Sequence, residues 1–135
     1  MSSERPLRIA FLTYRGHPYT GGQGVYTRHM ARELKALGHH VEVISGPPYP
    51  HTDEDVPLTK LPSLDLYRMP DPFRIPRLSE FKDRFDVLEY LVTAGATFAE
   101  PLTFSLRAHR ELAGRLGEFD LVHDNQCLGT GIWKI

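Results

Sequence analysis

A strand-like stretch, a glycine-rich turn, an amphipathic stretch and a second strand-like stretch follow one another at the start of this chain. Residues 7–14 are almost continuously apolar, as in a strand covered on both faces, and residues 25–37 carry apolar side chains at helical spacing. Gly38 stands where a helix ends, and residues 40–45 again resemble a strand. This order predicts a β-α-β unit with a right-handed crossover, the basis of an open α/β sheet.

The predicted helix has two faces. Its apolar set is Tyr26, Met30, Leu34 and Leu37, and its basic set on the opposite side is Arg28, Arg32 and Lys35. The basic side would allow weak peripheral contact with anionic lipid, although a solvated helix face is the simpler interpretation.

The rest of the chain continues the alternation of strands and helices. Prolines at positions 47, 48, 50, 57 and 62 predict an irregular surface loop over residues 46–62, and residues 64–69 are a candidate third strand. A helical region is expected to begin near Leu78, and Pro101 suits the first turn of another helix. That helix would bury one face, formed by Leu102, Leu106, His109, Ala113 and Leu116. Residues 119–123 are the fourth candidate strand, and residues 129–135 begin a helix that leaves Ile132, Trp133 and Ile135 uncovered.

Composition narrows the class of protein. A chain of 135 residues with 41% hydrophobic residues fits one domain, residues 1–135. A net charge of -1 gives no bulk attraction to nucleic acid, so no nucleic-acid partner is expected. The single cysteine, Cys127, excludes an internal disulfide framework. With neither an apolar leader nor a stretch long enough to span a bilayer, the chain is predicted to be cytoplasmic, with optional contact at the inner face of the membrane.

The glycine turn is the best clue to function. Gly21, Gly22 and Gly24 precede the predicted helix, whose first N–H groups are unpaired and lie at the positive end of the helix dipole. The turn also follows the first strand, where open α/β sheets bind ligands. It can therefore receive an anion such as a phosphate, or it can be an ordinary flexible turn.

Two familiar nucleotide motifs do not fit this turn. A dinucleotide fingerprint would need glycine at position 27, where Thr27 stands, and an acid after the second strand, which runs into Ser45 and Gly46. A P-loop would need lysine and a hydroxyl residue after its last glycine, and these are missing. An NAD-dependent oxidoreductase is therefore a weak alternative, and a P-loop ATPase is excluded.

Three segments together resemble the N-terminal half of family 4 retaining glycosyltransferases of GT-B fold. They are LRIAFL at residues 7–12, GGQGVYTRHMARELKALGHHVEVI at residues 21–44 and FDLVHD at residues 119–124. The resemblance implies a Rossmann-like, acceptor-side domain that is incomplete at 135 residues, with the C-terminal donor-binding domain absent. It implies transfer of a sugar from a nucleotide-sugar to an acceptor with retention of configuration, and a fragment that is inactive alone. A non-catalytic α/β module that binds sugar or protein is the alternative.

The resemblance also assigns roles to residues. Gly21, Gly22, Gln23 and Gly24 would contact the distal phosphate of the donor, and no metal cofactor is expected where helix N-termini and basic side chains carry the phosphate charge. His123 would face the transferred sugar and polarise its hydroxyl groups, although the residues alone also fit a histidine satisfied by backbone. The acceptor-side candidates are Tyr14, His17, Tyr19, Tyr26, Asp124, Asn125 and Gln126. For the aromatic candidates, ordinary packing or solvent exposure is the alternative.

Overall fold

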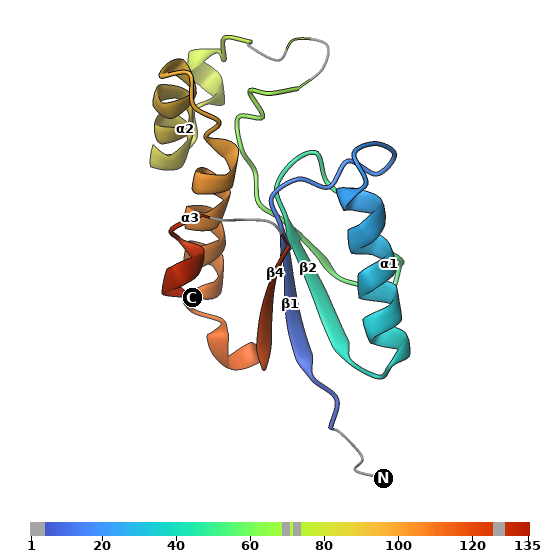
Figure 1. Ribbon diagram of the computed structural model, residues 1–135. Helices are drawn as coiled ribbons and strands as arrows, with labels where there is room; N and C mark the ends of the chain where they lie inside the picture. The colour runs from blue at the N-terminus through green and yellow to red at the C-terminus, as the bar shows by residue number, and fades with distance from the viewer. Residues whose placement is uncertain (1–4, 69–70, 72–73, 126–128) are drawn as a thin grey trace.

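The computed structural model describes residues 5–68, 71, 74–125 and 129–135. At its centre lies a four-stranded parallel sheet with the order β3-β2-β1-β4. The strands are β1 (Arg8–Thr13), β2 (His40–Ser45), β3 (Leu58–Lys60) and β4 (Leu121–Asn125). Figure 1 shows α1 (Gln23–Ala36) on one side of the sheet and α3 (Glu100–Leu112) on the other, with α2 (Arg84–Ala94) beside α3. The predicted α/β fold with a parallel sheet flanked by helices is confirmed.

β1 is an internal strand, as predicted, and both of its faces are covered. It pairs with β2 from Arg8 opposite His40 to Thr13 opposite Ser45, and with β4 on its other edge. Because successive side chains of a strand point to opposite faces, the apolar residues of β1 divide between two cores. The core under α1 contains Ile9, Phe11, Ala31, Val41, Val43 and Val56. The core under α3 contains Ala10, Leu12, Ile44, Leu61, Phe104, Ala108 and Leu112.

Glycines with left-handed backbone flank α1. Gly22 precedes the helix with φ 74°, and Gly38 follows it with φ 94°. At the C-terminal end, the N–H of Gly38 donates to the carbonyl of Lys35 (2.9 Å), and the N–H of His39 donates to the carbonyl of Leu34 (3.2 Å). These two bonds form a Schellman motif, so the helix stops at Gly38 as predicted.

The buried face of α1 differs from the predicted one. Its fully buried residues are Gly24, Thr27 and Ala31, while Met30 and Leu34 are partly buried at the edge of the core. Tyr26 and Leu37 are exposed. Small side chains on the buried face let the helix lie close to the sheet, and the larger apolar residues are displaced to its flanks.

The predicted apolar face of α3 is wrong. Leu102, Leu106 and His109 are only half-buried, and Ala113 and Leu116 lie exposed after the end of the helix. The face that packs on the core instead carries Phe104, Ala108 and Leu112. It also includes the buried Arg107, which pairs with carboxylates of α2. Apolar spacing failed here because a paired arginine occupies a position that the pattern assigns to the surface.

The two remaining helix starts follow their sequence signals closely. The helical region expected from Leu78 begins with the 3-10 turn Leu78–Glu80 and continues as α2 from Arg84. The Asp83 carboxylate caps α2 by accepting from the N–H groups of Phe85 (2.9 Å) and Asp86 (3.0 Å). Pro101 is the second residue of α3, in the first turn as expected.

The third strand lies earlier in the chain than predicted. β3 falls inside the proline-containing interval expected to be irregular, whereas the described part of the predicted strand, residues 64–68, is not a strand. The N–H of Val43 donates to Pro57 O (2.9 Å), and the N–H of Leu61 donates to Ser45 O (2.8 Å), so a short ladder fits between two prolines. Residues 64–68 leave the sheet and form contacts with the helices instead.

The C-terminal residues pack partly against α3. The N–H of Gly131 donates to Ser105 Oγ (3.1 Å), and a 3-10 turn, Ile132–Lys134, follows. Ile132 and Ile135 contact the core under α3, so the prediction that they lack cover is wrong for these two. Trp133 is 92% exposed.

Candidate functional site

The glycine turn lies at the carboxyl end of β1, and each of its glycines has a distinct structural reason. Gly21 and Gly22 have positive φ values of 79° and 74°, and open space surrounds the position that a Cβ would take at either residue. Gly24 is buried, and a Cβ there would lie 2.3 Å from the carbonyl oxygens of Gly16 and His17. The turn therefore needs glycine for backbone conformation at 21 and 22, and for close packing at 24.

The N-terminus of α1 is open toward this turn. Among the residues that the structure describes, no side chain caps the helix, and its first turn contains no acidic residue. The N–H of Tyr26 donates to Gly22 O (2.8 Å), but within the described residues no acceptor engages the N–H groups of Gly24 and Val25. Unpaired N–H groups at the positive end of a helix favour an anion.

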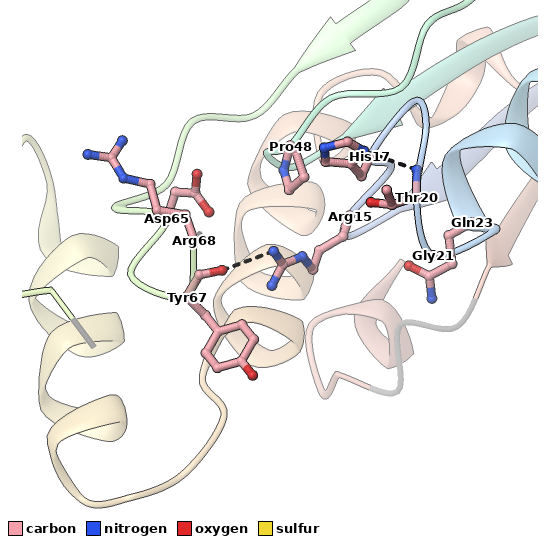
Figure 2. A pocket seen from close by; sticks show the side chains of 9 residues that line it. All are labelled: Arg15, His17, Thr20, Gly21, Gln23, Pro48, Asp65, Tyr67 and Arg68. Carbon is pink, nitrogen blue, oxygen red and sulfur yellow. Dashed lines mark hydrogen bonds between the residues drawn. The ribbon is translucent and has the colours of Figure 1, made fainter. Parts of the chain in front are cut away.

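A pocket of about 660 Å³ lies beside the turn (Figure 2). One wall is the loop after β1, and the other is the segment of residues 65–68 that follows β3. The lining residues are Arg15, His17, Thr20, Gly21, Pro48, Gln23, Asp65, Tyr67 and Arg68. His17 stabilises the loop after β1, because its Nδ1 accepts from the N–H groups of Tyr19 (3.2 Å) and Thr20 (3.1 Å).

Arg15 connects the two walls. Its Nη1 donates to Glu100 Oε2 (2.8 Å), and its Nη2 donates to the carbonyl of Tyr67 (3.0 Å), as Figure 2 shows for the second bond. The Arg15 guanidinium carbon also lies 5.7 Å from the centroid of the Tyr67 ring. A single side chain from the end of β1 thus places a cation at the floor of the pocket.

The second wall is anchored mainly through its main chain. The N–H of Leu64 favours the charged form of the buried Glu89 carboxylate of α2, and the carbonyl of Leu64 accepts from Arg74. The N–H of Tyr67 favours the charged form of Glu100 in α3 and lowers its pKa, and the carbonyl of Tyr67 accepts from Arg15 (3.0 Å). Asp65, between these anchors, has a positive φ of 49°, and its buried Oδ1 has no hydrogen-bond partner among the described residues.

His123 lies on β4 opposite Phe11, and the two rings stack at 4.6 Å with 16° between their planes. The strand was predicted to end at His123 but continues to Asn125, so His123 stands two residues before its carboxyl end. Its side chain is exposed, and it is not among the described residues that line the 660 Å³ pocket. Asp124 is half-buried and, by strand alternation, faces the opposite side of the sheet.

Asn125 is the residue of β4 that reaches the carboxyl end of the sheet. It pairs with Thr13, the last residue of β1, and its Nδ2 is buried without a hydrogen-bond partner among the described residues. An unpaired buried amide is costly unless something outside these contacts satisfies it. Gln126 lies outside the described residues.

Of the predicted aromatic candidates, His17 alone is among the described residues that line the pocket. Tyr14 packs edge-on against Phe98, with ring centroids 6.3 Å apart. Tyr19 is exposed and edge-on to His51, and Tyr26 is exposed on α1.

Sequence reasoning missed the pocket residues Arg15, Asp65, Tyr67 and Arg68. Arg15 could have been found from its place directly after the first strand, where ligand-binding residues collect. The other three belong to a segment interpreted as a strand. The N–H of Asp65 donates to Ser63 Oγ (3.1 Å), and a serine just after Pro62 is a turn signal that argues against a strand.

The basic face of α1 is paired with acids. Arg28 contacts Asp53, Arg32 contacts Glu33, and Lys35 contacts Asp55. This pairing supports the solvated-face interpretation, because little positive charge remains to attract anionic lipid. No helix in the described part of the chain is long and apolar enough to cross a membrane.

The fold and the site together define a Rossmann-like α/β domain with a glycine turn and a pocket at the carboxyl end of its sheet. Residues 21–133 match the family described as "Glycosyl transferase 4-like domain", and the chain belongs to this family. The resemblance to family 4 glycosyltransferases is thereby confirmed. Over 130 residues, or 96% of its length, the chain is 65% identical to the MMP alpha-(1->4)-mannosyltransferase of Mycolicibacterium hassiacum. It spans 32% of that relative.

Proposed function

We propose that this chain is the N-terminal, acceptor-side domain of a retaining, GT-B-type glycosyltransferase that moves a hexose from a nucleotide-sugar to an acceptor. The family match supports glycosyl transfer, and the name of the 65% identical relative favours mannose as the transferred sugar. A second, donor-binding domain is part of the proposal, because the chain spans only 32% of that relative.

The observation that carries the proposal is the open N-terminus of α1 beside the pocket. Gly21 and Gln23 line the pocket, and the neighbouring N–H groups of Gly24 and Val25 have no acceptor among the described residues. N–H groups held in this way would bind the distal phosphate of the donor and stabilise the charge that develops as the diphosphate leaves.

His123 is proposed to face the transferred sugar and to polarise its hydroxyl groups. Its exposed position on β4 leaves it accessible from the α1 side of the sheet. Asn125, Asp124 and His17 remain proposed contacts of the acceptor side. Asn125 stands at the carboxyl end of β4, and its Nδ2 has no hydrogen-bond partner among the described residues. It is therefore better placed than Asp124 to contact a ligand there.

Transfer is proposed to need no metal ion, because helix N–H groups and basic side chains would supply the positive charge. We therefore expect that EDTA leaves the initial rate of transfer within about twofold of its value in untreated enzyme. Added magnesium or manganese should not restore or raise the rate. A rate that collapses with EDTA and returns with one of these ions would contradict this part of the proposal.

The test of function uses the full-length protein that contains this chain. It is incubated with UDP- and GDP-hexoses and with manno-oligosaccharide acceptors, and the anomeric configuration of the product is read by NMR. We expect transfer with retention. Acceptor binding without transfer, together with no effect of changing His123, would instead identify the non-catalytic binding module that the sequence left open.

The role of the turn is tested by replacing Gly22 with valine. The new side chain would project into open space at the phosphate position, and we expect a loss of kcat/KM of about tenfold or more. The control is Gly38→Val, which imposes the same left-handed strain at the far end of α1. Equal kinetic losses in the two variants would remove the turn from the mechanism.

A further inference from the structure

Glu100 is a buried carboxylate that the transfer reaction described above does not use. It is the first residue of α3 and is 8% exposed. Its Oε1 has no hydrogen-bond partner among the described residues, whereas its Oε2 accepts from Arg15. Burying a charged group in this way costs free energy, so its position calls for a reason beyond packing.

Glu100 holds both walls of the 660 Å³ pocket. Its Oε2 accepts from Arg15 Nη1 (2.8 Å) in the loop after β1, and the N–H of Tyr67, in the segment of residues 65–68, favours its charged form. Arg15 closes the connection by donating to the carbonyl of Tyr67 (3.0 Å). Glu100, Arg15 and the carbonyl of Tyr67 are therefore joined by two hydrogen bonds, both donated by Arg15, which connect the two walls.

The charged groups around Glu100 make Arg15 its main counter-ion. Glu89 of α2 and Asp65 of the second wall are both acidic and both act against the Glu100 charge. Arg107 of α3 is already paired with Glu89 (2.9 Å) and Asp86 (2.6 Å). The charge of Glu100 thus depends on one guanidinium that itself lines the pocket.

We propose that Glu100 is a positioning residue for the acceptor: by holding Arg15, and through Arg15 the carbonyl of Tyr67, it fixes the two walls at the separation that an acceptor sugar needs. This inference rests on the function proposed above. Glu100 acts through its two partners and need not touch the acceptor itself.

The link between the walls should depend on pH near neutrality. Burial raises the pKa of Glu100 to about 7, with Asp65 and Glu89 adding to the increase, while Arg15 and the N–H of Tyr67 oppose it. Above this pKa the carboxylate is charged and holds Arg15. As the pH falls through about 7, the carboxyl becomes neutral and the hold weakens, so the KM for the acceptor should rise.

The experiment measures kcat and the KM values of donor and acceptor from about pH 5.5 to about pH 8.5 in the full-length protein. GDP-mannose serves as the donor and α-(1->4)-linked mannobiose as the acceptor probe. We expect Glu100→Gln to raise the acceptor KM about tenfold at about pH 8, with little change in the donor KM. The acceptor KM of this variant should be nearly independent of pH.

The matched control is Glu42→Gln, which removes a carboxylate that pairs with Arg115 (2.8 Å) at a distance from the pocket. Its acceptor KM and pH profile should equal those of the wild type. Arg15→Lys breaks the same link from the other side, so it tests the inference even if Glu100→Gln fails to fold. Glu100→Asp should show an intermediate acceptor KM.

An acceptor KM and pH profile like those of the wild type in both Glu100→Gln and Arg15→Lys would overturn this inference and leave the proposed function standing. An equal loss in kcat and in both KM values would also overturn it, because it would indicate a general structural role. A wild-type protein that transfers no sugar from any tested donor would overturn the proposed function itself.

Discussion

At the scale of the residue, Gly24 shows how a missing side chain sets the shape of the site. Its Cα packs against the carbonyl groups of Gly16 and His17, which brings the start of α1 onto the loop after β1. The two segments that present N–H groups and the pocket wall are therefore held together by one close contact. Phosphate binding alone would not require glycine at this position.

Gly24→Ala is expected to destabilise the chain by about 1–3 kcal/mol or more, because its Cβ would lie 2.3 Å from two backbone oxygens that have little freedom to move. Denaturant unfolding followed by circular dichroism measures the change. Gly114→Ala is the control, since a Cβ there meets nothing within 4 Å. Similar unfolding midpoints for the two variants would show that the loop after β1 shifts to admit the new Cβ at little cost in stability.

His123→Phe separates a catalytic role from packing. Phenylalanine can keep the stacked contact with Phe11 but removes both ring nitrogens, so the stability should hold while kcat falls by about tenfold to a hundredfold. Steady-state kinetics of the full-length protein give the result. An unchanged kcat in this variant, together with a lower kcat in Asn125→Ala, would identify Asn125 as the residue that contacts the sugar.

At the scale of the element, α2 and α3 are joined by buried charges. Arg107 of α3 pairs with Asp86 (2.6 Å) and Glu89 (2.9 Å) of α2, and Glu89 in turn anchors the main chain of Leu64. This network sets where the second pocket wall leaves the sheet. Removing one partner of a buried ion pair strongly destabilises the fold, because the remaining charge is left with neither a counter-ion nor water around it.

Arg107→Met is expected to cost about 3–5 kcal/mol of unfolding free energy at neutral pH, because it leaves the Glu89 and Asp86 carboxylates without their counter-ion. Burial already raises the pKa of Glu89, and loss of Arg107 would raise it further. The difference from the wild type should therefore shrink as the pH falls and Glu89 becomes neutral. Urea unfolding at about pH 5 and about pH 7.5 measures this.

Arg110→Met is the matched control for this prediction. Arg110 lies on the same helix, but its side chain is 53% exposed where it pairs with Asp83, so its loss should cost less than about 1 kcal/mol. An equal cost for both arginines, or a cost at Arg107 that does not change with pH, would contradict the account of the network.

The elements that sequence predicted well are those with local signals. β1, α1, β2 and β4 carry apolar runs, a helical period and glycine stops, and the structure shifts their ends by only a residue or two. β3, the face of α3 and the wall at residues 64–68 depend on contacts between distant residues. Glu89, Glu100 and Arg107 look like surface residues in the sequence, because nothing local reveals the partner that allows each to be buried.

The site divides in the same way. The glycine turn could be located from its spacing alone, because positive φ and close packing demand glycine whatever the rest of the chain does. The pocket opposite the turn could not, because its second wall is placed by the N–H and carbonyl groups of Leu64 and Tyr67. Main-chain contacts leave almost no trace in the sequence.

At the scale of the whole molecule, the described residues form one side of the proposed donor site. The described residues form the glycine turn and the pocket, while the function proposed above assigns the nucleotide to a second domain. N–H groups at a single helix end give modest affinity for an anion. The chain alone should therefore bind a donor weakly.

Calorimetric titration of the isolated chain with UDP- and GDP-sugars is expected to show no binding tighter than about 1 mM, and no sugar transfer, because the groups that would hold the nucleotide are elsewhere. The full-length protein under the same conditions is the control. Micromolar affinity of the isolated chain for a UDP- or GDP-sugar, or sugar transfer by it, would contradict the proposed dependence on a second domain.

The main-chain anchoring of residues 64–67 has a consequence for how this domain can diverge. Arg15 donates to the carbonyl of Tyr67, and the N–H of Tyr67 acts on Glu100. The path of the wall therefore does not depend on which side chain stands at position 67. Tyr67 and Arg68 are both exposed to the pocket, so they can be exchanged without moving the backbone. New acceptor preferences could thus arise at these two positions by single substitutions, while the buried Glu100 and Arg15 stay unchanged.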